Sequence, residues 1–348
     1  MNKFIKLSPK EKMPYFIKAA SDCGLPEQII EKDFWVCWLL SEIFSLDEIG
    51  DYLTFKGGTS LSKAYNVIRR FSEDIDISIE KSYLGFTGDK DPKQSTSSKK
   101  AKSLIKEITL KCSEFVENRL IEELHSSIDR KLSSKNGHSY NQNTDWKLVV
   151  DEDNPDTLLF HYPVESNKYS YIKPIVRIEM GARADHQPVE VKKIEPYVSQ
   201  NLSKEVFNSD IEIQVLSVER TFWEKATILH MYANYPASKD IPIRQSRHFY
   251  DFYCLLQSNA KEKALASIEL LGMVTEHKKL YFKSSWAGYE SAKKGTLKLI
   301  PESRILQMMK DDYIKMNEMF FDDPIEWEVI TSNIKLFEED FNNTISGS

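Results

Sequence analysis

The chain has 348 residues, 41% of them hydrophobic, which is enough to form the core of one large or two medium globular domains. A formal net charge of -6 excludes a chain that is basic throughout, although it allows a local basic surface. The four cysteines lie far apart without a CxxC pair, so a reducing compartment is expected and neither a zinc site nor a disulfide framework is indicated. The best apolar run, Phe34–Leu40, is too short to cross a bilayer, and we expect a cytoplasmic protein without membrane contact.

The first part of the chain alternates helical and strand-like patterns. An amphipathic stretch from Pro26 to about Phe44 predicts a helix, and YLTFK at residues 52–56 predicts a strand. A second helix and a second strand are predicted within FKGGTSLSKAYNVIRRFSEDIDISIE, residues 55–80. The predicted order is therefore helix, strand, helix, strand.

Residues 88–135 form a segment of different composition. From Lys90 to Lys111, seven lysines are accompanied by only two acidic residues. The beginning of the segment is rich in proline, serine and lysine and predicts a loop, whereas residues 103–125 have the periodicity of a long helix. We interpret the segment as a lysine-rich loop and helix inserted into the first domain.

Two patterns divide the rest of the chain. Short runs typical of strands come first, and beyond about Leu216 the periodicity becomes helical. We therefore predict an α+β chain with a mixed sheet in residues 1–205 and a helical domain in residues 206–348. The strand-like runs are residues 145–151, 156–163, 173–181 and 189–198.

The acidic residues of SEDIDIS point to a divalent cation. Alternate side chains of a strand share a face, so Asp74 and Asp76 project together while Ile75 and Ile77 lie on the opposite face. Two neighbouring carboxylates repel each other unless a cation lies between them, and Mg²⁺ prefers oxygen ligands. The alternative is an amphipathic edge strand with a hydrated acidic face.

The residues before this strand are suited to binding phosphate. Gly57 and Gly58 permit a tight turn, and Thr59 and Ser60 can cap a helix whose apolar residues continue to Ile68. The start of such a helix offers free N–H groups to phosphate oxygens. The GxxxxGK[ST] spacing of a P-loop is absent. Together with the carboxylates, the turn predicts a site for a metal-bound nucleotide.

Residues 57–78, GGTSLSKAYNVIRRFSEDIDIS, resemble the signature of the DNA polymerase beta-like nucleotidyltransferases. They resemble more closely the AbiEii/AbiGii-type nucleotidyltransferase toxin family of bacterial abortive-infection and toxin-antitoxin systems. EKDFWVCWLL at residues 31–40 is also similar to the N-terminal segment of that family. The resemblance implies a polymerase beta-like mixed sheet with flanking helices, followed by a C-terminal helical domain. It also implies transfer of a nucleotide from an NTP with Mg²⁺, or alternatively Mn²⁺, as the cofactor.

A third carboxylate is expected from a neighbouring strand, because nucleotidyl transfer with two metal ions usually needs one. On KPIVRIEMG, Arg177 and Glu179 share a face, whereas Val176 and Ile178 lie opposite. The family resemblance, rather than the motif itself, implies Glu179 as a further metal ligand. An exposed Arg/Glu pair on an ordinary strand is the alternative.

The resemblance also extends to the helical domain. SVERTFWEKATILH places a family lysine at Lys225, and RHFYDFYCL places an arginine at Arg247 and an aspartate at Asp251, whereas His248 replaces a family aspartate. The Lys225 ammonium suits triphosphate oxygens, and Asp251 could orient it or activate an acceptor hydroxyl. The alternative is a salt bridge between helices.

Two further cations are candidates for nucleotide binding. Lys63 and Arg70 are seven residues apart on the predicted helix and would share one face. A solvated helix face is an equally simple interpretation.

The resemblance implies a growth-inhibiting toxin, acting in phage defence and paired with an antitoxin. Its acceptor would be RNA, such as the 3′ end of tRNA, and the segment Lys90–Lys111 could contact the RNA backbone. Three alternatives are transfer to protein, an Mg-NTP-binding regulatory module without turnover, and a DxD glycosyltransferase, which the glycine turn disfavours. The sequence selects neither the base of the NTP nor the oligomeric state.

Overall fold

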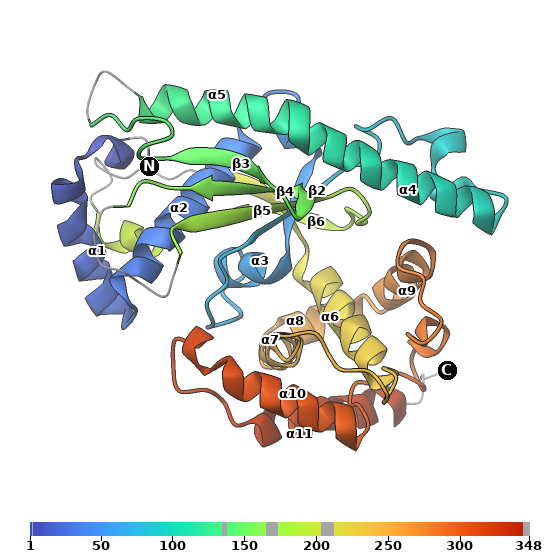
Figure 1. Ribbon diagram of the computed structural model, residues 1–348. Coiled ribbons are helices and arrows are strands. Elements are labelled where there is room, and N and C mark those ends of the chain that lie inside the picture. Colours follow the sequence, from blue (N-terminus) through green and yellow to red (C-terminus); the bar gives the residue numbers. More distant parts are fainter. Residues whose placement is uncertain (2, 134–137, 165–172, 203–211, 344–348) are drawn as a thin grey trace. The chain divides into compact units, whose positions relative to one another are not determined.

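The computed structural model describes residues 1, 3–133, 138–164, 173–202 and 212–343 (Figure 1). The chain divides into two compact units. The sheet unit comprises Met1–Ala64 and Phe71–Val215, and the helical unit comprises Tyr65–Arg70 and Leu216–Ser348. The predicted boundary between residues 205 and 206 lies outside the described residues.

The sheet unit is organised around a mixed sheet of seven strands in the order β3-β4-β5-β2-β1-β7-β6. The pairs β1–β2, β3–β4 and β4–β5 are antiparallel, whereas β2–β5 and β1–β7 are parallel. The predicted mixed sheet is therefore confirmed, including all four strand-like runs. The strands are β1 Leu53–Lys56, β2 Ile75–Ile79, β3 Lys147–Asp151, β4 Asn154–His161, β5 Ile175–Gly181, β6 Val189–Lys193 and β7 Glu212–Leu216.

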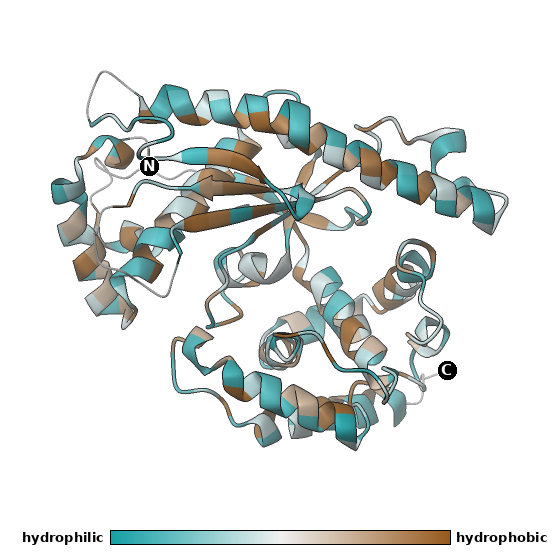
Figure 2. Cartoon of the chain, viewed as in Figure 1, coloured by the Kyte–Doolittle hydropathy of each residue, from teal (hydrophilic) through white to brown (hydrophobic). Residues whose placement is uncertain are grey.

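The apolar core of the sheet unit lies between the sheet and α2. Two tryptophans of α2, Trp35 and Trp38, have ring centroids 5.9 Å and 6.1 Å from that of Phe160 on β4, and all three side chains are at most 1% exposed. Hydrophobic stretches along β4 and β5 are visible in Figure 2. The helices of this unit are α1 Pro9–Cys23, α2 Glu27–Phe44, α3 Gly57–Lys63, α4 Ser98–Phe115 and α5 Ile121–Leu132.

The long helix predicted after the lysine-rich loop is confirmed. Helices α4 and α5 are joined through a π-helical turn at Val116–Leu120 and run on as one rod (Figure 1). The sequence pattern predicts a start at Ser103, but the helix begins at Ser98, because the Ser97 hydroxyl accepts a hydrogen bond from the Lys100 N–H and caps it.

The predicted extent of the helix after the glycine turn is wrong. Helix α3 ends at Lys63, and the following residues, Tyr65–Arg70, belong to the helical unit. Within them Asn66 has a positive φ of 51°, a conformation incompatible with continuing the helix. Lys63 and Arg70 therefore do not share a helix face.

The core of the helical unit is aromatic. Phe222 and Trp223 on α6 are fully buried, and Phe222 contacts Phe252 and Phe337. The helices are α6 Val218–Ala233, α7 Arg247–Leu256, α8 Ala260–Ala266, α9 Glu269–Tyr281, α10 Ser303–Lys315 and α11 Trp327–Asn343. Within the described ranges of the chain, no helix has the length and apolar character needed to span a membrane.

Candidate active site

The glycine turn and the acidic strand meet at Gly57. Strand β1 ends at Lys56, directly opposite Asp76 in the antiparallel pair β1–β2, and Gly57 follows with a positive φ of 78°. A Cβ atom added at Gly57 would lie 1.9 Å from the Asp76 Oδ2 atom. Only glycine satisfies both requirements, because it tolerates this backbone conformation and leaves space for the carboxylate.

Two hydroxyls of α3 hold this turn in place. Thr59 Oγ1 donates a 2.5 Å hydrogen bond to the Asp74 carbonyl and lies 2.9 Å from Ser72 Oγ, while Ser60 Oγ donates to the Gly57 carbonyl at 2.9 Å. Both residues are buried, whereas Gly57 and Gly58 are half-buried. The hydroxyls are thus engaged with the protein itself, and only backbone N–H groups at the start of α3 could contact a phosphate.

Carboxylates from two strands gather beside the turn. Asp76 on β2 is the register partner of Glu179 on β5, so their side chains are neighbours on one face of the sheet. Asp74 immediately precedes β2 and is half-buried. Burial, followed by repulsion from Glu179, Glu73 and Asp76, raises the pKa of Asp74 to about 6. The site therefore concentrates negative charge around Asp74, although Glu73 also pairs with the Lys32 ammonium of α2.

Arg177 is the cation nearest to these carboxylates on β5. Its side chain pairs with Asp151 at 3.0 Å and more loosely with Glu179 at 3.6 Å. The predicted strand pattern is confirmed, since Val176 and Ile178 are fully buried while the Glu179 side chain is 45% exposed. Among the residues that the structure describes, no three carboxylate, histidine or cysteine side chains converge as a complete set of metal ligands.

Lys63 occupies a buried ion pair of its own. Its ammonium pairs with the Asp33 carboxylate of α2 and lies 3.5 Å from the centroid of the Tyr197 ring. Asp33 also accepts a 2.7 Å hydrogen bond from the Tyr197 N–H. Sequence reasoning missed this pair, although one signal was available: Asp33 directly precedes the apolar run Phe34–Leu40 of α2, and a buried carboxylate requires a partner.

A second charged cluster lies in the helical unit, around Asp251 of α7. The Arg70 guanidinium donates to both Asp251 oxygens, at 2.7 Å and 2.9 Å, and the Lys225 ammonium donates to one of them at 2.6 Å. The side chains of Arg70, Lys225 and Asp251 are 4%, 8% and 0% exposed. The structure thus joins three predicted site residues, whereas Arg247, at the start of α7, is half-buried.

The charges within this cluster do not cancel. Burial opposes ionisation of Asp251, but the charges of Arg70 and Lys225 outweigh it and hold the pKa of Asp251 below its usual range. Burial, followed by the charges of Lys225 and Arg247, lowers the pKa of His248 well below its usual value. The His248 Nδ1 atom lies 3.1 Å from the Lys225 ammonium and accepts its hydrogen bond. One anion thus faces two buried cations, and the neutral histidine adds no charge.

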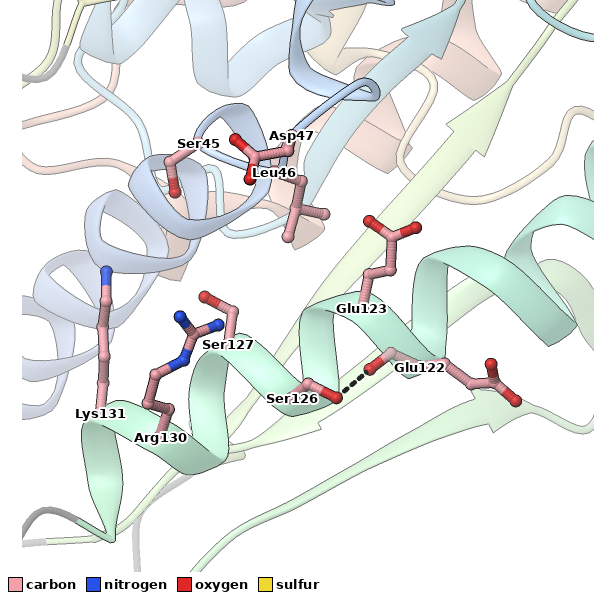
Figure 3. A pocket seen from close by; sticks show the side chains of 9 residues that line it. All are labelled: Ser45, Leu46, Asp47, Glu122, Glu123, Ser126, Ser127, Arg130 and Lys131. Atoms are coloured by element: carbon pink, nitrogen blue, oxygen red, sulfur yellow. Dashed lines mark hydrogen bonds between the residues drawn. The ribbon is translucent and has the colours of Figure 1, made fainter.

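A pocket of about 490 Å³ elsewhere in the sheet unit lies between the end of α2 and α5 (Figure 3). Its walls carry both acidic and basic side chains, among them Asp47, Glu123 and Arg130. Lys131 in its wall pairs with the buried Glu42. None of the predicted site residues lines this pocket, so it is not the candidate active site.

Comparison with known proteins identifies the family. The model of the family described as nucleotidyl transferase AbiEii toxin, type IV TA system, matches residues 38–341. Among solved structures, the nucleotidyltransferase toxin MenT4 from Mycobacterium tuberculosis H37Rv is similar over 97% of each chain, with 14% sequence identity and a TM-score of 0.39. No curated protein matches this sequence. The chain therefore belongs to the AbiEii family and is a nucleotidyltransferase toxin of a type IV toxin-antitoxin system, a membership that implies an NTP substrate and an antitoxin partner.

Proposed function

We propose that the protein transfers a nucleoside monophosphate from an NTP to a hydroxyl of an RNA acceptor, in a reaction that depends on Mg²⁺ or Mn²⁺. The observation that supports this most strongly is the contact between the glycine turn and the acidic strand, where Gly57 leaves space against the Asp76 carboxylate. The acceptor hydroxyl gives up its proton to solvent and its oxygen forms a bond to the α-phosphorus. The bond between the α-phosphorus and the oxygen that bridges to the β-phosphate breaks, and pyrophosphate leaves.

Asp74, Asp76 and Glu179 would hold the metal. Their donor atoms are all carboxylate oxygens, which suit a hard divalent cation, and the repulsion that raises the pKa of Asp74 is relieved when a cation binds. Because no three carboxylate, histidine or cysteine side chains converge on one point in the described part of the chain, most of the ligands would be nucleotide phosphates and water, which is the usual environment of Mg²⁺. When bound, the metal neutralises charge on the phosphates and polarises the acceptor.

We propose two groups of nucleotide contacts from the protein. Backbone N–H groups of Gly57, Gly58, Thr59 and Ser60 would bind phosphate oxygens at the start of α3. Lys225 would neutralise the triphosphate, with Arg247 as a further cation. The net positive charge of the cluster around Asp251 supports this role, because an uncompensated buried charge favours a nearby anion. Lys63 is left out of this set, since Asp33 already neutralises it.

Helix α4 supports RNA as the acceptor. Lys99 and Lys100 lie in its first turn and Lys102 directly after it, at the positive end of the helix dipole, where acidic residues are favoured and the first turn has none. Together with Lys106 they are exposed, and none of the four pairs with an acidic residue in the part of the chain that the structure describes. This placement costs stability unless a polyanion binds there, and the phosphate backbone of RNA, such as tRNA near its 3′ end, is a polyanion.

The transfer reaction is tested by incubating the protein with each α-³²P-labelled NTP, Mg²⁺, and total bacterial RNA and protein. We expect label in an RNA band that is absent with EDTA and in the Asp74→Ala/Asp76→Ala double variant. Label in protein instead of RNA would mean that the same transfer reaction uses a protein acceptor. Intact NTP under every condition, with binding retained, would instead support a nucleotide-binding module without turnover.

The RNA contact is tested separately by measuring affinity for tRNA across a range of salt concentrations. A variant with Lys99, Lys100, Lys102 and Lys106 changed to glutamine should reduce the slope of log K against log salt by roughly 0.7 to 0.9 for each RNA phosphate that these lysines neutralise. The matched control neutralises four exposed lysines elsewhere and has the same net charge: Lys10, Lys239, Lys283 and Lys293. Equal slopes in the two variants would remove α4 from the RNA-binding surface.

A further inference from the structure

The segment Tyr65–Arg70 is attached to the helical unit, although it connects two elements of the sheet unit. The Tyr65 hydroxyl donates to the Leu216 carbonyl at 2.9 Å, and the Arg69 N–H donates to the Tyr250 hydroxyl at 3.3 Å. The Phe321 N–H donates to the Arg69 carbonyl at 3.2 Å, and Arg69 also pairs with Asp322. The connection between the glycine-turn helix and the acidic strand is therefore held along its length by the helical unit.

Arg70 is the last residue of this segment and its most firmly held one. Both of its bonds to Asp251 are charge-assisted, and the planar fork of a guanidinium fixes direction as well as distance. Only three residues separate Arg70 from Asp74. At the far side of this short link, Thr59 Oγ1 holds the Asp74 carbonyl and contacts Ser72. Residues 71–74, which lead to the acidic strand, thus lie between two hydrogen-bonded residues: Arg70, bound to Asp251, and Asp74, bound to Thr59.

We propose that Arg70 and Asp251 form a positioning pair, which sets the path of residues 71–74 and thereby the placement of the Asp74 carboxylate. We place neither residue in contact with the reacting atoms: Arg70 would act through Asp74, whereas Asp251 would act through Arg70 and also holds Lys225. The proposal rests on the proposed function for its kinetic consequence, but its structural consequence is independent of which acceptor is used.

An ordinary structural salt bridge is the competing interpretation, and it makes a different prediction. A buried ion pair is often no more stabilising than apolar residues of equal volume, so stability alone is a weak reason for this arrangement. A structural pair would affect the whole helical unit. A positioning pair would affect residues 71–76 and the rate of the chemical step.

The test uses Arg70→Lys in the full-length protein, because it keeps the charge beside Asp251 and removes the bidentate fork. We expect faster hydrogen exchange in residues 71–76 and a loss in kcat on the order of 10- to 100-fold, with NTP affinity changed by less than about twofold. Asp251→Asn breaks the pairs with Arg70 and with Lys225 together, so it should lower kcat at least as much, and the double variant should be little worse than Asp251→Asn alone.

Asp312→Asn is the matched control. Asp312 is 8% exposed in the same unit and accepts hydrogen bonds from the Arg244 and Ser246 N–H groups at 2.6 Å and 2.9 Å, at the start of α7. It should lower the melting temperature without changing kcat or exchange in residues 71–76.

Unchanged exchange and kcat in Arg70→Lys would overturn the proposal, and this variant carries the test if Asp251→Asn does not fold. An additive double variant would also overturn it. If the wild-type protein transfers no nucleotide, the proposed function fails, while exchange in residues 71–76 still decides whether the pair positions the strand.

Discussion

Asp74 and Asp251 are both aspartates, but the charges that surround them have opposite signs. Asp74 lies among Glu73, Asp76 and Glu179, and its pKa rises to about 6, whereas Asp251 lies between two cations and its pKa falls. The carboxylates around Asp74 are only partly paired, with Lys32 and Arg177, and would be stabilised by a cation from outside the protein. The carboxylate of the helical unit already has its cations, and it has one more than it needs.

The comparison separates binding from positioning. A cluster that lacks counter-charge gains stability when a ligand supplies it, so it is suited to binding a metal-nucleotide complex. In the helical-unit cluster the Asp251 carboxylate is fully paired, so it holds Arg70 in a fixed direction and is suited to positioning it, while the remaining positive charge of Lys225 stays available to an anion. Substitutions in the two clusters should therefore have different consequences for stability and for activity.

The largest effect on stability is expected for Asp251→Ala. This change leaves Arg70 and Lys225 buried without their anion, and breaking a buried pair in this way costs about 3–5 kcal/mol. Urea denaturation measures the loss, with a matched Asp74→Ala variant for comparison. A loss below about 1 kcal/mol for Asp251→Ala would contradict the assignment of Asp251 as the anion that stabilises the buried charges of Arg70 and Lys225.

The next effect is on activity rather than stability. Asp76→Asn removes one proposed metal ligand and should reduce nucleotide transfer by at least about 100-fold, while the free energy of unfolding stays the same or rises because repulsion within the cluster is relieved. Transfer assays and thermal melts measure the two quantities. Mg²⁺ should raise the melting temperature of the wild-type protein and have little effect on that of Asp76→Asn; equal shifts would place the cation elsewhere.

A smaller effect is expected for Gly57→Ala, which strains the backbone at φ 78° and pushes the new methyl group into the Asp76 carboxylate. The free energy of unfolding should fall by about 1–3 kcal/mol, and nucleotide transfer should fall as well. Gly85→Ala is the control, because Gly85 has a φ of 87° and an added Cβ there meets no atom within 4 Å. It should cost about 1–2 kcal/mol and leave transfer intact.

The smallest expected effect is the dependence of the free energy of unfolding on pH. The pKa of Asp251 is lower in the folded protein than the value of about 3.9 expected in the unfolded chain, so its contribution to stability is fully present above that value. The contribution is lost as the pH falls through the folded pKa, with a slope of at most about 1.4 kcal/mol per pH unit. Urea denaturation of the wild type and Asp251→Asn between pH 7 and pH 3 measures it. If the free energies of unfolding of the two proteins followed parallel curves below pH 4, this contribution of Asp251 would be contradicted.

Local patterns in the sequence predict much of the site. The alternation of Asp74 and Asp76 with isoleucines predicts their shared face, and the alternation on β5 predicts the exposure of Glu179. The β2–β5 pairing itself could not be predicted from local patterns, because about 100 residues separate the partners and no periodicity encodes which strands become neighbours. The family resemblance, rather than strand spacing, brings Glu179 into the set.

Long-range charge pairing is the part that sequence patterns leave undetermined. Helical periodicity places Lys63 and Arg70 on one face, yet Lys63 pairs with Asp33 in the sheet unit and Arg70 pairs with Asp251 in the helical unit. Asn66, with its positive φ, is incompatible with a continuous helix from Lys63 to Arg70, which the prediction of a shared face required. The partner of a buried cation is selected by the tertiary fold, which a window of neighbouring residues does not contain.

The attachment of Arg70 to Asp251 also has a consequence for the newly synthesised chain. Arg70 leaves the ribosome 181 residues ahead of Asp251, which at about 5–20 residues per second corresponds to roughly 10–40 s of synthesis. During this time the acidic strand can be present without the residue that fixes the segment leading to it. A toxin of this design stays incomplete on the ribosome until α7 of its second unit has been made.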